Sequence, residues 1–206
     1  MKKRWSLTKS SDSLTRDPEL AGLILRLGAA VNAIRASQRW TILCVKRRGV
    51  AARRDRMWSF LIATAYLKEV IDGLLKPHYE KITQLARQDG TPEKAIKDLG
   101  QLMSTKPYAL YPRMLLRARN NLVFHWDEEP FRNWAAHYGK KTVIWAEGVG
   151  TKDGEVVFSA SLDALLDSVI PGATEVEVRE GVGEVAEASG LIVGVFQRAI
   201  HAYISN

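Results

Sequence analysis

Residues 17–37, DPELAGLILRLGAAVNAIRAS, decide the fold class of this chain. The apolar side chains in this stretch recur every three or four positions: Leu20, Leu23, Ile24, Leu27, Val31 and Ile34. Such spacing is typical of one face of an amphipathic α-helix, and an Asp-Pro-Glu sequence commonly starts one. We therefore expect a helix from Asp17 to about Ser37.

Helical spacing returns through most of the chain. Residues 53–75 are apolar on most sides, which predicts a central helix. Pro77 is expected to kink or interrupt this helix before a continuation through Arg87. The remaining expected elements are a turn at 88–90, helical segments at 91–104, 108–126 and 131–138, and a last helix at about 184–204.

One segment favours strands instead. Within about 142–161, KTVIWAEG and GEVVFSAS flank a turn at Asp153-Gly154, and β-branched and aromatic residues are frequent on both sides. This pattern predicts an inserted β-hairpin. The expected fold class is therefore mainly α, a bundle of four to five main helices over residues 17–206 that follows a flexible basic tail at 1–16.

The amino-acid composition limits the kinds of protein that this chain can be. The chain has 206 residues and is 46% hydrophobic and 26% charged, which is usual for a soluble protein with one core. Its single cysteine, Cys44, excludes an internal disulfide and fits a reducing compartment. No apolar signal-peptide core follows the basic start, and the run at 57–67 is too short to span a bilayer. We expect a cytoplasmic protein with no membrane partner.

The net charge of +7 is concentrated in one part of the chain. Six basic residues lie within eleven positions: Lys46, Arg47, Arg48, Arg53, Arg54 and Arg56. A cluster of this kind attracts polyphosphate by Coulomb attraction and counterion release, so RNA is the expected partner. The candidate RNA-binding residues are Arg47, Arg48, Arg53 and Arg54. A solvated loop before a helix is the alternative interpretation.

An arginine, an asparagine and a histidine occur twice in residues 119–137, RNNLVFHWDEEPFRNWAAH. The first set is Arg119, Asn120 and His125; the second is Arg132, Asn133 and His137. The second set follows Pro130 on a segment too short for a core helix. The first set lies on the longer expected helix at 108–126 and is the candidate site.

Arg119 falls in the middle of the apolar face of that helix on a helical wheel. An unpaired charge in apolar packing costs several kcal/mol, so the guanidinium needs a partner. That partner is either an acid such as Glu69 or Asp72, or a phosphate in a cleft or subunit interface. His125 lies about 120° from Arg119 around a straight helix. Either the last helical turn unwinds, or two copies of the chain complete one cleft across a two-fold axis.

The stretch RNNLVFHWD resembles the signature of HEPN domains, which are helical bundles with an Arg, a polar residue and a His four to six residues after the Arg. Arg119, Asn120 and His125 match that signature position by position. The resemblance covers about residues 17–138 and the last helix, with the hairpin as an insert. It implies a HEPN-like bundle and a homodimeric, metal-independent endoribonuclease that needs no cofactor.

The resemblance also implies a role as a toxin or defence effector, for which an antitoxin protein is a candidate partner. Some HEPN proteins are non-catalytic, so a helical binding or dimerisation module is the alternative function. In family members neutralised by nucleotide addition, a tyrosine lies two positions after the histidine. Asp127 occupies that position here, so this mode of neutralisation is not expected.

The residue types suit cleavage of RNA. An imidazole exchanges protons near neutral pH, and a guanidinium stabilises charge on a phosphate that the ribose 2′-hydroxyl attacks. Asn120 would orient the substrate or the motif. A metal site would instead gather the residues His125, Asp127, Glu128, Glu129 and His137. Acids clustered at a helix end more often form a solvated turn, so no metal is expected.

Overall fold

The computed structural model of the chain describes residues 17–46, 50–104, 132, 136 and 175–205. Its elements are α2 (Pro18–Val45), α3 (Val50–Val70), the π-helical turn η1 (Ile71–Leu75), α4 (Lys76–Gln88), α5 (Glu93–Gln101) and α9 (Glu175–Ser205). This part of the chain is helical and holds no strand, which confirms the mainly α fold class. The tail expected at 1–16 and the hairpin expected at 142–161 lie outside the described residues.

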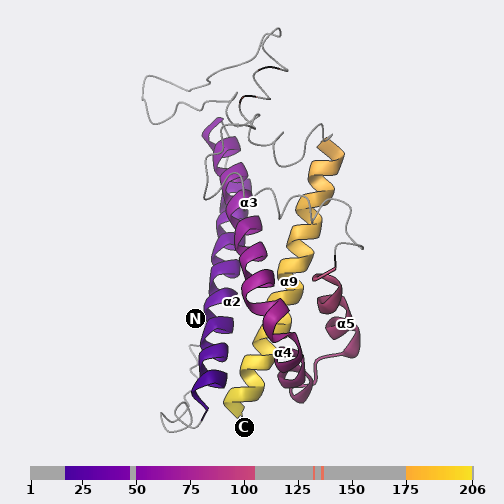
Figure 1. Cartoon of the computed structure of the whole chain (residues 1–206). Helices are drawn as coiled ribbons and strands as arrows, with labels where there is room; N and C mark the ends of the chain where they lie inside the picture. The colour runs from indigo at the N-terminus through magenta and orange to yellow at the C-terminus, as the bar shows by residue number, and fades with distance from the viewer. Residues whose placement is uncertain (1–16, 47–49, 105–131, 133–135, 137–174, 206) are drawn as a thin grey trace.

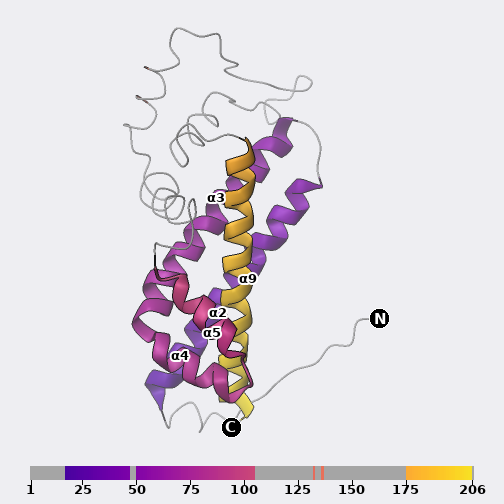
Figure 2. The ribbon, with the colours of Figure 1, turned by 90° about the vertical axis from the view of Figure 1, so that its right-hand side faces the viewer.

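The described helices form an elongated bundle. α2 and α3 run antiparallel side by side, and α9 runs along the other side of the molecule (Figure 1). α2 packs against α3 and α9, while α4 packs against α9 and η1. The start of α2 and the end of α9 lie at the same end of the bundle as α4 and α5 (Figures 1 and 2).

The core fills the space between α2, the α3–α4 rod and α9. The largest side chains that are fully buried are Phe196, Leu27, Ile34, Leu61, Leu67, Leu75, Ile82, Leu99 and Ile192. The apolar positions predicted for the first helix form its buried face, since Leu23, Ile24, Leu27, Val31 and Ile34 are all buried.

At the start of α2, Asp17 Oδ1 accepts a hydrogen bond of 2.9 Å from the Leu20 amide. This side-chain cap satisfies one of the free amides of the first turn.

Two helices are longer than their sequence patterns predicted. α2 continues past Ser37 to Val45, and the Ser37 hydroxyl donates to the Ile34 carbonyl at 2.8 Å inside the helix. α9 begins at Glu175 and not near residue 184. The glycines at 181 and 183 lie inside α9, where each costs about 1 kcal/mol relative to alanine. Packing of α9 on α2 and α4 outweighs that cost.

The irregularity predicted at Pro77 takes the form of a π turn and not a break. Pro77 has no N–H for the carbonyl of Gly73, four residues earlier, and its ring would crowd that carbonyl in a regular helix. The wider turn η1 makes room, as the bond from the Lys76 amide to the Ile71 carbonyl shows. Arg26 of α2 donates to the Gly73 carbonyl at 2.8 Å. The rod changes direction between α3 and α4 (Figure 2).

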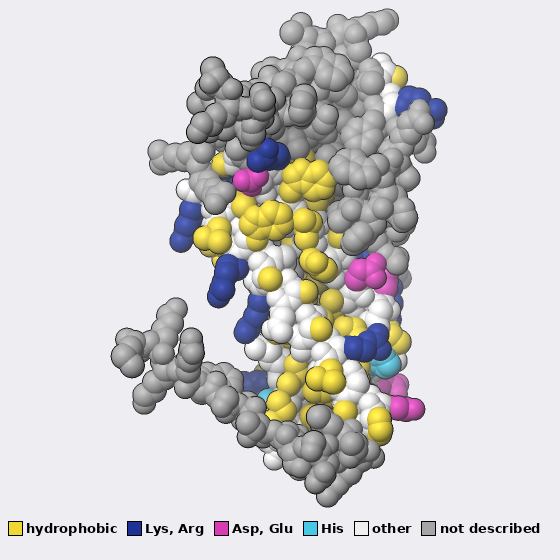
Figure 3. All heavy atoms as spheres, turned by 90° about the vertical axis from the view of Figure 1, so that its left-hand side faces the viewer, with side chains coloured by type: hydrophobic (Ala, Val, Ile, Leu, Met, Phe, Trp, Pro, Cys, Tyr) yellow, Lys and Arg dark blue, Asp and Glu magenta, His cyan; other side chains and the backbone are white. Residues whose placement is uncertain are grey.

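α2 is apolar on two sides. Opposite its buried face lie Leu25, Ala29, Ala36 and Leu43, of which Leu25 is 67% and Leu43 55% exposed. Figure 3 faces the side of α2 and α3, where hydrophobic side chains lie along the bundle beside Lys and Arg. Of the helices described, the stretch Pro18–Cys44 is long and apolar enough to cross a membrane by length and composition. A core helix of a soluble bundle meets the same criteria.

Candidate functional site

The predicted catalytic residues lie outside the described part of the chain: Arg119, Asn120 and His125. His137 of the second set also lies outside it, whereas Arg132 is helical and exposed. The acids of the alternative metal site, Asp127, Glu128 and Glu129, are likewise not described. The described residues include Asp72, one of the two acids expected as a partner of Arg119.

One of those acids, Asp72, already has two cationic partners. Lys76 Nζ lies 2.7 Å from Asp72 Oδ1, and Lys68 Nζ contacts Asp72 Oδ2. Partial burial raises the pKa of Asp72, but the bonds from Lys68 and Lys76 outweigh burial and bring this pKa below its ordinary value. Asp72 of η1 is therefore an ionised carboxylate bonded to a lysine of α3 and a lysine of α4.

The basic cluster is described in part. Arg53 and Arg54 lie in the first turns of α3, and Arg47 and Arg48 lie outside the described residues. Arg54 Nε donates to Asp55 Oδ1 at 3.2 Å, and the Arg54 side chain is 36% exposed. A partly exposed ion pair of this kind contributes about 1 kcal/mol or less, and the exposed part of the guanidinium can meet other anions.

A second group of polar side chains begins at the end of α4. Gly90 has φ +73°, a left-handed conformation that side chains disfavour. Its amide donates to the Arg87 carbonyl at 3.0 Å, and the Thr91 amide donates to the Ala86 carbonyl at 3.1 Å. These two bonds form a Schellman motif, which closes the helix. The motif fixes Asp89 as the last residue before the turn, beside α9.

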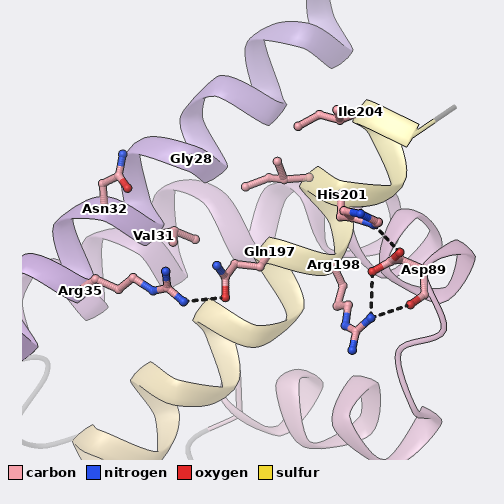
Figure 4. Close-up of a pocket in the computed structure, with 10 residues that line it drawn as sticks. Gly28, Val31, Asn32, Arg35, Asp89, Gln197, Arg198, His201 and Ile204 are labelled. Atoms are coloured by element: carbon pink, nitrogen blue, oxygen red, sulfur yellow. Dashed lines mark hydrogen bonds and ion pairs between the residues drawn. The ribbon is translucent and has the colours of Figure 1, made fainter. Parts of the chain in front are cut away.

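Asp89 joins α4 to the end of α9 through two side chains. Asp89 Oδ1 lies 2.6 Å from His201 Nδ1, and Asp89 Oδ2 lies 3.2 Å from Arg198 Nη1 (Figure 4). The hydrogen bond with His201, and after it the bond with Arg198, lowers the pKa of Asp89 below its ordinary value. The ionised carboxylate accepts, so His201 Nδ1 carries the proton and Nε2 is turned away from Asp89.

A cavity of about 460 Å³ opens beside this cluster, between α2 and α9. Arg35 of α2 reaches across to α9, where its Nη2 donates to Gln197 Oε1 at 2.9 Å (Figure 4). The other residues that line the cavity are Gly28, Val31, Asn32, Asp89, Arg198, Ile200, His201 and Ile204. The cavity thus combines an apolar floor with charged and amide side chains from three parts of the chain.

The sequence did not predict this cavity. A turn was predicted at Gln88-Asp89-Gly90, and the spacing of Arg198 and His201 places them on one face of a helix. Their contact with Asp89 could not be predicted from the sequence, because Arg198 lies 109 positions and His201 112 positions from Asp89. The residues of the motif at 119–125 are close in sequence, so their spacing alone is enough to predict a site. His201 acquires its carboxylate only through tertiary packing.

Comparison with protein-family models, curated proteins and solved structures finds no match for the chain. In the ranges that the structure describes, no group of three or more His, Cys, Asp or Glu side chains is placed to hold a metal ion. The candidate features are therefore the motif at 119–125, known from sequence, and the cavity between α2 and α9, known from structure.

Proposed function

We propose that the chain is a metal-independent endoribonuclease of HEPN type that acts as a toxin or defence effector. The observation that carries the proposal is the motif Arg119-Asn120-x4-His125, on a segment with helical apolar spacing. Arg119 would hold and stabilise the scissile phosphate, His125 would transfer the proton, and Asn120 would orient the substrate. The ribose 2′-hydroxyl is the nucleophile, so no cofactor is required.

One feature of the described helices supports the proposal. Segments on both sides of the motif in sequence are helical, as a HEPN-like bundle requires. The phosphate role of Arg119 comes from the motif itself and is tested by substitution.

The test is cleavage of single-stranded RNA by the full chain in excess EDTA. We expect products that end in a 2′,3′-cyclic phosphate, and no cleavage of DNA, which lacks the 2′-hydroxyl. His125→Ala should reduce the rate by about 10²- to 10⁴-fold, as removal of a general acid or base does. His137→Ala, from the second set, is the matched control and should retain activity. Activity that needs a divalent ion, or that is lost with His137 and kept without His125, would contradict the proposal.

Arginine substitutions test the phosphate role separately. Arg119→Lys should be severely impaired, because an ammonium group does not reproduce the planar fork of a guanidinium. Arg132→Lys is the control, since Arg132 is exposed. Melting curves of both variants distinguish lost catalysis from lost folding. An unfolded Arg119→Lys together with a fully active His125→Ala would identify Arg119 as a structural ion-pair partner.

A second candidate function is a non-catalytic helical module that pairs with another copy of the chain. The outward apolar side of α2 favours it, since Leu25 is 67% exposed. Sedimentation would then report about twice the mass of 23.0 kDa, and Leu25→Glu would return the monomer. A dimer that survives Leu25→Glu would exclude α2 as the interface.

A further inference from the structure

We propose that the cavity between α2 and α9 binds a small organic anion. Its charged group would meet Arg35 and Gln197, and its apolar part would lie on Val31, Ile200 and Ile204. The inference uses none of the residues of the proposed ribonuclease site, so either can fail without the other.

The polar lining of the cavity has a surplus of hydrogen-bond donors. The bond from Arg35 to Gln197 uses one of the five N–H donors of a guanidinium. Because the Gln197 oxygen accepts this bond, the amide nitrogen of Gln197 keeps its two N–H donors for another partner. Asn32, one turn before Arg35 and exposed, adds a further amide. A ligand that satisfies these groups must bring acceptors.

The charge of the lining also selects an anion. Asp89 is the single acidic residue among those that line the cavity, and its two oxygens are occupied by Arg198 and His201. The described partner of Arg35 is a neutral amide, so the positive charge of Arg35 meets no carboxylate in the lining. An anionic group placed here would form charge-assisted hydrogen bonds, which are about twice as strong as neutral ones.

The size of the cavity and its apolar floor favour a ligand in which the anionic group is attached to an apolar group. The cavity volume of about 460 Å³ lies within the range of about 300–1,000 Å³ typical of small-molecule sites. Val31 is buried at the floor, and Ile200 and Ile204 are half-buried. Gly28 leaves further room, since a Cβ added there would meet no atom within 4 Å. An inorganic ion would leave most of this surface uncovered.

Phenyl phosphate is a suitable probe because it joins an anion to an apolar ring of small size. Titration of the full chain by calorimetry should show one saturable site for phenyl phosphate. Inorganic phosphate, which lacks the ring, and benzyl alcohol, which lacks the charge, should each bind at least tenfold more weakly. Equal affinity for inorganic phosphate would overturn the role of the apolar floor. No binding of phenyl phosphate at millimolar concentration would overturn the site.

Three variants tie the binding to the cavity. Arg35→Gln should weaken phenyl phosphate binding by about tenfold or more, the loss expected for one hydrogen bond to a charged group. Arg39→Gln is the matched control, because Arg39 is exposed one turn further along α2 and does not line the cavity. Gly28→Leu should fill the space and abolish binding while the helix stays intact, since leucine favours helices over glycine.

Unfolding curves of these variants separate binding from folding. Gly28→Leu is expected to melt at or above the temperature of the unmodified chain, so its loss of binding cannot be attributed to unfolding. Phenyl phosphate binding that survives both Arg35→Gln and Gly28→Leu would place the ligand elsewhere and overturn the inference.

Discussion

Gly100 is the glycine with the least room around it among those that the structure describes. A Cβ at this position would lie 2.8 Å from the hydroxyl oxygen of Tyr79 and 3.4 Å from its Cζ. The hydroxyl is held in place, since it donates to the Ile96 carbonyl at 2.9 Å. The absence of a side chain at Gly100 thus lets α5 approach α4 closely enough for this hydrogen bond.

Gly100→Ala should therefore lower the free energy of unfolding by about 1 kcal/mol, although alanine favours helices, because the Tyr79 ring must shift and strain its bond. Chemical denaturation measures the change. In a Tyr79→Phe background the hydroxyl is gone, so the same substitution should be neutral or stabilising. Equal costs in the two backgrounds would show that the two positions are not coupled.

At the scale of the elements, Arg26 connects α2 to the joint between α3 and α4. Its guanidinium donates to the Gly73 carbonyl, to which Pro77 cannot donate because proline has no N–H. The Nη1 atom of Arg26 also lies 3.5 Å from His78 Nε2. The bond lies at the surface, so its net contribution to stability is about 0.5–1.5 kcal/mol. The joint is thus held from outside its own helix.

Arg26→Met keeps the apolar stem of the side chain and removes the donor. We expect faster amide hydrogen exchange at residues 71–80 and a lower melting temperature, because the Gly73 carbonyl loses its partner. Arg39→Met, further along the same helix, is the control and should leave exchange at the joint unchanged. Equal exchange in the two variants would show that Arg26 does not hold the joint.

The same elements show what the sequence can and cannot predict. The helices were predictable where apolar spacing is regular, as with Leu27, Val31 and Ile34 of α2. Their ends were not, because Ser37 bonds within α2 and the glycines near 181 are held in α9 by packing. In the cavity, the turn at Gly90 was predictable from local rules. The pairing of Asp89 with His201 depends on packing between distant segments and has no local signature.

At the scale of the whole molecule, Asp72 and Asp89 are two of the carboxylates that tie the described helices together. Asp72 links α3 to α4 through Lys68 and Lys76, and Asp89 links α4 to α9 through His201 and Arg198. Both have a pKa below the ordinary value in the folded state. A depressed pKa means that the unfolded chain takes up the proton first as pH falls.

The stabilisation from these groups is therefore complete above about pH 4, the ordinary pKa of an aspartic acid, and is lost as pH falls through the folded values. Melting temperatures measured from pH 6 to pH 2 should decline most steeply below pH 4. Asp89→Asn should be less stable at pH 6 and should show a shallower decline. A decline of unchanged slope in this variant would show that Asp89 does not contribute.

Because α2 packs on α9, the bundle can be completed only after α9 has been synthesised. Arg35 and Gln197 meet across 162 positions of sequence, and α4 likewise packs on α9. A ribosome adds about 5–20 residues per second, so α2 exists for roughly 8 to 32 seconds before α9 is complete. During that interval α2 and α3 can pair, but the sides of α2 and α4 that pack on α9 in the folded chain lack this partner. Chains that stop before residue 175 would never gain it, and the cavity forms only after α9 has been made.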